Sequence, residues 1–399
     1  MKIVIPFPYF REGMGGIYKF CLEFSREAVS RGHEVVIISS LPKNKNVDDV
    51  MSGVRIIRVP LHHARLFRRI RDYVLFGRKV SVLIKKEHPD IILGVSLGAY
   101  GGVGCDAPLV YRSAATPIIV EQNIWKKLLN DKIVKKSLLK RVFLSFDFFL
   151  QKTIERACLR NAKAFFCQSN ELYSYFQREY SLSSSLRVCS PCTGVDTKKF
   201  YRDFYQRGIV RERLGVRDDE KIIMFSGGLS PIKGAFVLEN ALSLVFKSIP
   251  NAKFLLVGSE QCSFNLGEYN NRILRTGSIS LSEIPNFYSA SDIFVLPSLV
   301  EGFPNTLLEA MSCSLPCICT PLVGMAEYAK NKRDILIVPF YDHLALADAI
   351  IFCLKNPAIC SSLGKNARKQ ALKFDWGIVS TKMLSFLESV VESESKIST

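Results

Sequence analysis

The chain of 399 residues lacks any uninterrupted apolar run long enough to cross a membrane. Its most apolar stretch, residues 142–150, is too short to span a bilayer. The chain also lacks a basic opening segment followed by an apolar one, because residues 2–5 already have the composition of a strand. We therefore expect neither a membrane-spanning helix nor a cleavable leader.

Cysteines at metal-site spacing are also missing. Cys189 and Cys192 form a C-x-x-C pair, but no second pair lies at zinc-site spacing, so we expect no metal site. The chain has twelve cysteines, and Cys313, Cys317 and Cys319 fall in an apolar run that is typical of buried thiols. This cysteine usage fits the reducing cytoplasm.

Acidic residues are few compared with basic ones. There are 37 Asp and Glu residues against 54 Lys and Arg residues, which gives a formal net charge of +17. Such a charge predicts attraction to nucleic acid, to phosphorylated ligands or to an anionic membrane surface. A hydrophobic content of 48% excludes a disordered chain, and the length suffices for two ordinary domains.

The first half of the chain alternates strand and helix patterns. A glycine-containing loop with Gly15 and Gly16 lies between a strand at residues 3–7 and a helix at residues 17–30. The loop is not a G-x-G-x-x-G fingerprint, so its glycines either approach a ligand or simply form a turn. Further strands are predicted at residues 34–39, 90–94, 109–111, 164–167 and 187–190. Arg112 follows one of them, at the edge where ligands bind in such sheets.

The second half repeats this alternation. Strands are predicted at residues 221–226, 253–258, 272–277, 293–296, 315–319 and 335–338. We expect an α/β protein with domains at residues 1–200 and 201–374 and a final helix at 375–399. The loop after the strand at 221–226 contains Gly227, Gly228 and Lys233. Its N–H groups and lysine predict a phosphate cradle; the alternative is a plain loop with a surface lysine.

Two glutamates, Glu301 and Glu309, are separated by seven residues after the apolar run 293–296. The spacing places Glu301 in a strand-to-helix loop and Glu309 about one turn inside the helix, with Pro304 in the first helical turn. A carboxylate in an apolar loop is costly without a partner, and a helix N-terminus favours an anion or a hydroxyl-rich group. The alternative is a helix-terminal acid followed by a solvated helical glutamate.

The segment from Glu301 to Glu309 resembles the E-x7-E motif of retaining GT-B glycosyltransferases of the family 4 type. The resemblance implies two Rossmann-like domains facing a cleft, with the last helix packed back on the first domain. It implies that Lys233 binds the donor diphosphate and is catalytic together with Glu301, that Glu309 binds the ribose, and that no metal is required. The remaining residues implied to bind substrate are Gly15, Gly16, Arg112, Gly227, Gly228, Gly302, Phe303, Pro304, Asn305 and Thr306.

The chain departs from this family at three places. Gly228 stands where the family has an arginine that contacts the diphosphate, and Arg112 or Arg272 could replace it. Residues 112–114 stand where a histidine is usual, and Ser314 where a glycine is usual. These departures leave open a catalytically weak or inactive partner subunit that binds nucleotide sugar. An epimerase of the same fold is disfavoured by the complete E-x7-E motif.

Basic residues mix with apolar ones at residues 65–71 and 126–141. This pattern predicts an interfacial helix on anionic lipid; the alternative is a soluble helix with a solvated lysine face. The resemblance implies a metal-independent hexosyltransferase that uses a UDP- or GDP-linked sugar. We expect a glycan or lipid-linked acceptor in surface polysaccharide or glycolipid synthesis, a peripheral position on the inner face of the cell membrane, and no nucleic-acid partner.

Overall fold

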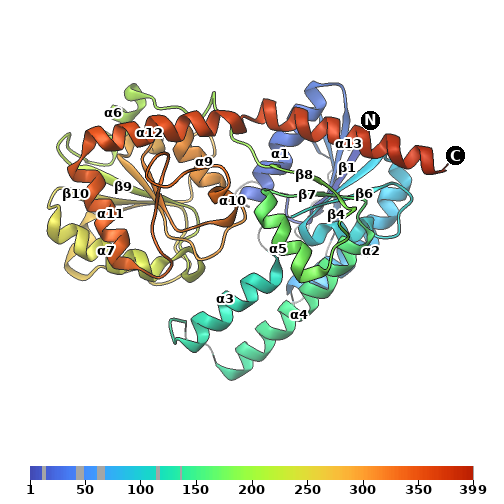
Figure 1. Cartoon of the computed structure of the whole chain (residues 1–399), viewed down its shortest axis with the longest axis horizontal. Coiled ribbons are helices and arrows are strands. Elements are labelled where there is room, and N and C mark those ends of the chain that lie inside the picture. Colours follow the sequence, from blue (N-terminus) through green and yellow to red (C-terminus); the bar gives the residue numbers. More distant parts are fainter. Residues whose placement is uncertain (11–14, 42–48, 61–67, 114–116, 135–136, 399) are drawn as a thin grey trace. The chain divides into compact units, whose positions relative to one another are not determined.

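The chain folds into two compact units, which are described separately (Figure 1). The computed structural model describes residues 1–10, 15–41, 49–60, 68–113, 117–134 and 137–398. Unit 1 comprises residues 1–123, 136–193 and 376–399, and unit 2 comprises residues 124–135 and 194–375. The chain thus enters unit 2 slightly before the predicted boundary at residue 200. Residues 124–135 join unit 2 although they come from the middle of the first half.

Unit 1 is built on an eight-stranded sheet with the order β3-β4-β2-β1-β5-β6-β7-β8. Only the pairing of β3 with β4 is antiparallel among the described strands. Strand β5 is buried at every position because helices cover both faces of a parallel sheet. The strands are β1 (Lys2–Pro6), β2 (Glu34–Leu41), β3 (Asp49–Met51), β4 (Val54–Pro60), β5 (Ile91–Val95), β6 (Leu109–Arg112), β7 (Ala164–Phe166) and β8 (Arg187–Cys189).

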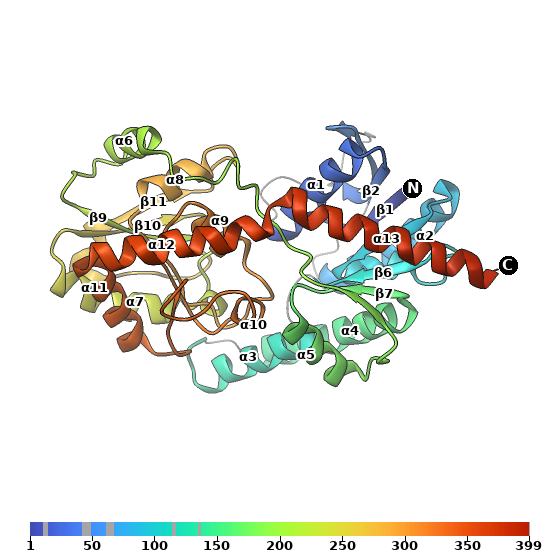
Figure 2. The ribbon, with the colours of Figure 1, turned by 45° about the horizontal axis from the view of Figure 1, so that its top comes forward.

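The helices of unit 1 include the last helix of the chain, α13, which packs beside α1 (Figure 2). The rings of Phe20 and Trp376 lie 6.0 Å apart, and Arg187 donates hydrogen bonds to Ser389 and Ser393 of α13. The helices are α1 (Gly15–Ser30), α2 (Arg68–Glu87), the 3-10 helix η1 (Ser96–Gly102), α4 (Leu138–Asn161), α5 (Asn170–Tyr180) and α13 (Trp376–Ser398). Helix α3 (Ile118–Asn130) begins in unit 1 and ends within residues 124–135 of unit 2.

Unit 2 contains a six-stranded parallel sheet with the order β11-β10-β9-β12-β13-β14. The strand order reverses between β9 and β12, which is the point where such sheets bind ligands outside their carboxyl ends. The strands are β9 (Lys221–Ser226), β10 (Ala252–Val257), β11 (Ile273–Gly277), β12 (Ile293–Leu296), β13 (Cys317–Cys319) and β14 (Leu336–Ile337).

Helices connect these strands on both faces of the sheet. They are α6 (Phe204–Arg213), η2 (Pro231–Lys233), α7 (Ala235–Ser248), η3 (Gly267–Arg272), α8 (Ile284–Ala290), α9 (Asn305–Ser312), α10 (Val323–Ala326), α11 (His343–Lys355), α12 (Pro357–Ala371) and η4 (Leu372–Phe374). The predicted strand at 221–226 and the one at 293–296 coincide with β9 and β12. In the described part of the chain, no single helix is both long and apolar enough to cross a membrane, and the bent pair α11–α12 meets that test only as a pair.

Candidate functional site

The glycine loop after β9 is fixed by the loop after β10. Gly227 N donates to Val257 O at 2.8 Å, and Leu229 N donates to Ser259 O at 2.9 Å. A Cβ on Gly258 would lie 2.2 Å from the carbonyl oxygen of Gly227, and Gly258 has a φ of +130°. Only glycine fits there, because both the space and the backbone angle exclude a side chain. The two loops therefore hold the Gly227 backbone rigidly at the carboxyl edge of the sheet.

Lys233 is placed by a short turn that is locked against the end of β12. Lys233 ends the 3-10 helix η2, and Gly234 follows it in the left-handed conformation, with a φ of +76°. A Cβ on Gly234 would lie 2.1 Å from Pro297 O. Leu299 N also donates to Ile232 O at 2.8 Å. The lysine turn and the loop after β12 are thus one structural piece.

The ammonium of Lys233 forms an ion pair with Glu301 Oε1. Ser298 Oγ donates to the same carboxylate oxygen at 3.1 Å. The sequence predicted that Glu301 needs a partner, and the structure provides two. An ammonium has three N–H donors, so Lys233 can hold Glu301 and still donate to a phosphate oxygen. A positive and a negative side chain are therefore positioned together at the switch point of the sheet.

Glu309 lies on α9 as its fifth residue and is 3% exposed. Tyr288 OH lies 3.0 Å from Glu309 Oε2 and 3.1 Å from Thr306 O. Burial, followed by the Glu309 charge, raises the pKa of Tyr288 well above its ordinary value, so the phenol remains a hydrogen donor. This contact holds the Glu309 carboxylate in one orientation.

The segment between the two glutamates is anchored by its aromatic residue. The Phe303 ring is buried, with centroids 5.7 Å from Tyr328 and 5.2 Å from Phe374. A Cβ on Gly324 would lie 1.9 Å from Gly302 O, so α10 packs directly against this backbone. Phe303 can therefore contact a ligand only through its backbone. The position of Pro304 was predicted one residue off, because Pro304 is the N-cap and α9 begins at Asn305.

The remaining predicted residues belong to unit 1. Gly15 and Gly16 open α1, and Gly15 has a φ of +75°. Arg112 ends β6 and is 3% exposed, with its guanidinium 3.5 Å from the centroid of the Phe20 ring. Its Nε and Nη1 atoms have no hydrogen-bond partner within the described residues. The substrate-binding roles of these three residues stay predictions.

The expectation that Arg272 could replace the missing arginine is wrong. Its guanidinium donates to the carbonyls of Phe246, Ile249 and Ala252 at 2.6–2.9 Å, which caps the end of α7. Arg272 precedes β11 and so lies at the amino edge of the parallel sheet, opposite the glycine loop. The side chain beside Gly228, where the family has its arginine, is Gln261: a Cβ on Gly228 would lie 2.4 Å from Gln261 Nε2.

Sequence reasoning missed several residues that support the site. Tyr288, Ser298 and Thr320 come from three different connections, and Thr320 Oγ1 donates to Ser298 O. None of them belongs to a motif, so only the folded chain brings them together. Ser314, predicted as a departure, has a φ of +58°, the left-handed region that glycine adopts at lower cost. In the described part of the chain, no three His, Cys, Asp or Glu side chains gather as a metal site.

Two family descriptions match the chain. "Glycosyl transferases group 1" matches residues 206–370, and "Glycosyltransferase Family 4" matches residues 14–199. An Escherichia coli relative, UDP-Gal:alpha-D-GlcNAc-diphosphoundecaprenol alpha-1,3-galactosyltransferase, is 28% identical over 72% of both chains. A Campylobacter jejuni relative, N,N'-diacetylbacillosaminyl-diphospho-undecaprenol alpha-1,3-N-acetylgalactosaminyltransferase, is 26% identical over 56% of this chain and 60% of its own length.

Solved structures match nearly the whole chain. Sucrose-phosphate synthase from Thermosynechococcus elongatus has a TM-score of 0.80 and 21% identity, over 98% of this chain and 100% of its own. HepE from Anabaena, solved in complex with UDP and glucose, has a TM-score of 0.71 and 18% identity over the same shares. Both comparisons concern the fold, and both agree with the two doubly wound sheets described above.

Proposed function

The chain is a glycosyltransferase with the GT-B fold and belongs to the family 4 type, and we propose that it transfers a sugar from a nucleoside diphosphate sugar with retention of the anomeric configuration. The observation that carries the proposal is the ion pair between Lys233 and Glu301 at the switch point of the second sheet. The buried Glu309 lies on the helix that follows Glu301. This set of groups favours a working enzyme over an inactive partner subunit.

Each group has a distinct role in the proposed reaction. Lys233 and the Gly227 backbone stabilise the charge that develops on the leaving diphosphate, so no metal is required. Glu309 accepts hydrogen bonds from the ribose hydroxyls of a uridine or guanosine nucleotide. Glu301, held by Lys233 and Ser298, accepts from hydroxyls of the transferred sugar. The departing phosphate takes the acceptor proton on the same face, which retains the configuration.

The proposed acceptor is a glycan or a lipid-linked glycan in the synthesis of a surface polysaccharide or glycolipid. Support comes from the acceptors in the names of the two relatives, which are diphospho-undecaprenol sugars. Helix α4 offers an exposed apolar face with Val142, Phe143, Phe146 and Phe149. We propose that this face and nearby lysines attach the enzyme to an anionic membrane from the cytoplasmic side. The other predicted basic stretch is residues 65–71. Residues 65–67 lie outside the part of the chain that the structure describes, and the side chains of residues 68–71 lie outside it as well.

The test is an assay of purified protein with UDP- and GDP-linked hexoses and a diphospho-undecaprenol sugar as acceptor. We expect release of one nucleoside diphosphate that depends on the acceptor, and NMR of the product should show the donor's anomeric configuration. Calorimetry with UDP and GDP identifies the base. Product with the inverted configuration, or a covalent sugar on Glu301, would contradict the proposed mechanism.

A further inference from the structure

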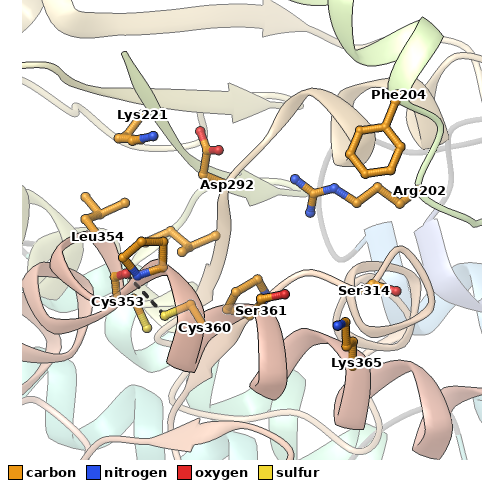
Figure 3. A pocket seen from close by; sticks show the side chains of 13 residues that line it. Arg202, Phe204, Lys221, Asp292, Ser314, Cys353, Leu354, Cys360, Ser361 and Lys365 are labelled. Atoms are coloured by element: carbon orange, nitrogen blue, oxygen red, sulfur yellow. Dashed lines mark hydrogen bonds between the residues drawn. The ribbon is translucent and has the colours of Figure 1, made fainter. Parts of the chain in front are cut away.

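Unit 2 has a pocket at the amino edge of its sheet, opposite the candidate donor site. Its volume is about 460 Å³, and it is drawn in Figure 3. Three lining residues mark the starts of neighbouring strands: Lys221 opens β9, Asp292 precedes β12 and Pro316 precedes β13. The Gly227–Lys233 loop leaves the other end of β9, so a six-residue strand of about 20 Å separates the two places.

The acidic residue of this pocket is already neutralised. Asp292 Oδ1 lies 2.8 Å from Arg207 Nη2, and Asp292 Oδ2 lies 3.4 Å from Arg211 Nη1. Ile222 N donates to Oδ2 at 2.8 Å. One carboxylate thus serves two guanidinium groups. It has little capacity left to balance further positive charge.

Three cations line the pocket, and each comes from a different element. They are Arg202 ahead of α6, Lys221 on β9 and Lys365 on α12. Arg202 donates to a carbonyl, Ser291 O, at 3.3 Å. Neither lysine forms an ion pair with a carboxylate of the described chain. Burial first, and then the charge of Arg207, lowers the pKa of Arg202, whereas the charge of Asp292 acts in the opposite direction.

The rest of the lining is largely apolar. Ile293, Pro316, Leu354 and Pro357 form walls, and the Phe204 ring, 75% exposed, lies beside Arg202 with 5.8 Å between the guanidinium carbon and the ring centroid. Cations that line a pocket together with apolar walls suit a ligand with a phosphate at one end and an apolar body at the other. From this arrangement we infer a second ligand site that binds a small organic phosphate, separate from the donor site.

The inference is independent of the proposed function, because the test measures binding rather than transfer. Phenyl phosphate is the probe, since it joins a phosphate to a flat apolar ring, and inorganic phosphate and phenol are its comparators. Isothermal titration should give one bound phenyl phosphate per chain, held more tightly than either comparator. Saturating UDP or GDP, whichever binds the donor site, should leave this affinity unchanged.

Variants assign the binding to the pocket. Arg202→Ala and Lys365→Ala should each weaken phenyl phosphate about tenfold, the usual loss for one charge-assisted contact. Lys369→Ala, an exposed lysine one turn further along α12 that does not line the pocket, should change nothing. Circular dichroism checks that each variant is folded, and Lys365→Gln provides a second, milder test at the same position.

The phosphate could belong to a soluble metabolite or to a lipid headgroup. Sedimentation with vesicles of phosphatidic acid separates the two sources. If Lys365→Ala loses vesicle binding and Lys369→Ala keeps it, the ligand is the lipid. If both variants bind vesicles as the wild type does, the ligand is the soluble molecule. The inference is overturned if phenyl phosphate does not bind, if the donor nucleotide displaces it, or if Arg202→Ala and Lys365→Ala bind it as the wild type does.

Discussion

Lys233 and Glu301, 68 positions apart in the sequence, form an ion pair at the carboxyl edge of the second sheet. Gly234 allows this contact, because the backbone of Pro297 passes where any side chain would stand. The pair joins the loop after β9 to the loop after β12. The diphosphate and sugar ends of the proposed donor site are therefore coupled through one contact.

Lys233→Ala should weaken the binding of the donor nucleoside diphosphate about tenfold or more. A hydrogen bond to a charged group contributes roughly 1.5–3 kcal/mol, and the variant also leaves Glu301 without its cation. Calorimetry with the nucleotide measures the loss. Lys247→Ala, an exposed lysine in the last turn of α7, is the control. Equal affinity in both variants would remove Lys233 from the site.

Glu301→Gln should lower turnover by about two orders of magnitude while the affinity for the free nucleoside diphosphate changes little. The reason is that Glu301 is proposed to contact the transferred sugar rather than the nucleotide. Ser298 can still donate to the amide oxygen, so the loop should keep its conformation. Steady-state kinetics and calorimetry separate the two effects. A variant with wild-type turnover would show that the carboxylate charge has no part in transfer.

Gly234→Ala should destabilise unit 2 more than Gly215→Ala does. Both glycines have a positive φ, +76° and +63°, so both variants carry the left-handed penalty of about 1 kcal/mol. A Cβ on Gly234 would also lie 2.1 Å from Pro297 O, whereas a Cβ on Gly215 would have no atom within 4 Å. We expect an additional loss of about 1–3 kcal/mol in the free energy of unfolding, by analogy with overpacked cores. Urea unfolding measures the difference; equal losses would contradict the close approach.

Glu155 should make unit 1 less stable as the pH rises from about 4.5 to 7. Burial raises its pKa from 4.5 to about 7, although Tyr180, Ile118 N and Tyr111 donate hydrogen bonds to it. The folded state therefore holds the proton more tightly than the unfolded state, and this stabilisation is lost as the pH passes through the folded pKa. At about 1.4 kcal/mol for each pH unit, the loss reaches about 3 kcal/mol.

Glu155→Gln removes this pH dependence. Hydrogen exchange of peptides from β6 and α4 in both proteins, between pH 4.5 and 8, gives the difference in opening free energy. The opening free energy of the variant should increase relative to that of the wild type as the pH rises. A difference that is constant with pH would show that folding does not raise the pKa of Glu155.

Phe146→Ser combined with Phe149→Ser should reduce flotation with anionic vesicles. Phe149 is 63% exposed on α4, and its apolar ring would be buried at the lipid interface. The matched control is Ile378→Ser, which removes an exposed apolar side chain from α13. High salt should weaken flotation of the wild type, because lysines add electrostatic attraction. Equal flotation of all three proteins would show that this face of α4 does not bind the membrane, and would favour the alternative that α4 is a helix of a soluble protein with a solvated lysine face.

The sequence by itself determined the strands that are buried on both faces. The apolar runs at 221–226 and 293–296 form β9 and β12, because a strand covered by helices on both sides needs such a run. The glutamate spacing also placed Glu309 inside α9. The antiparallel pair β3 and β4 was missed, since β4 mixes half-buried positions with buried ones and β3 has only three residues.

Only the tertiary structure decided which side chains meet. Tyr288 and Glu309 lie 21 positions apart, and Arg207 and Asp292 lie 85 apart, so no local pattern predicts either contact. The same is true of Arg272. Its position in the sequence is compatible with the donor site, but in the folded chain its guanidinium donates to carbonyls at the end of α7. Local periodicity records which face of an element is buried, whereas a site depends on which elements become neighbours when the sheet is assembled.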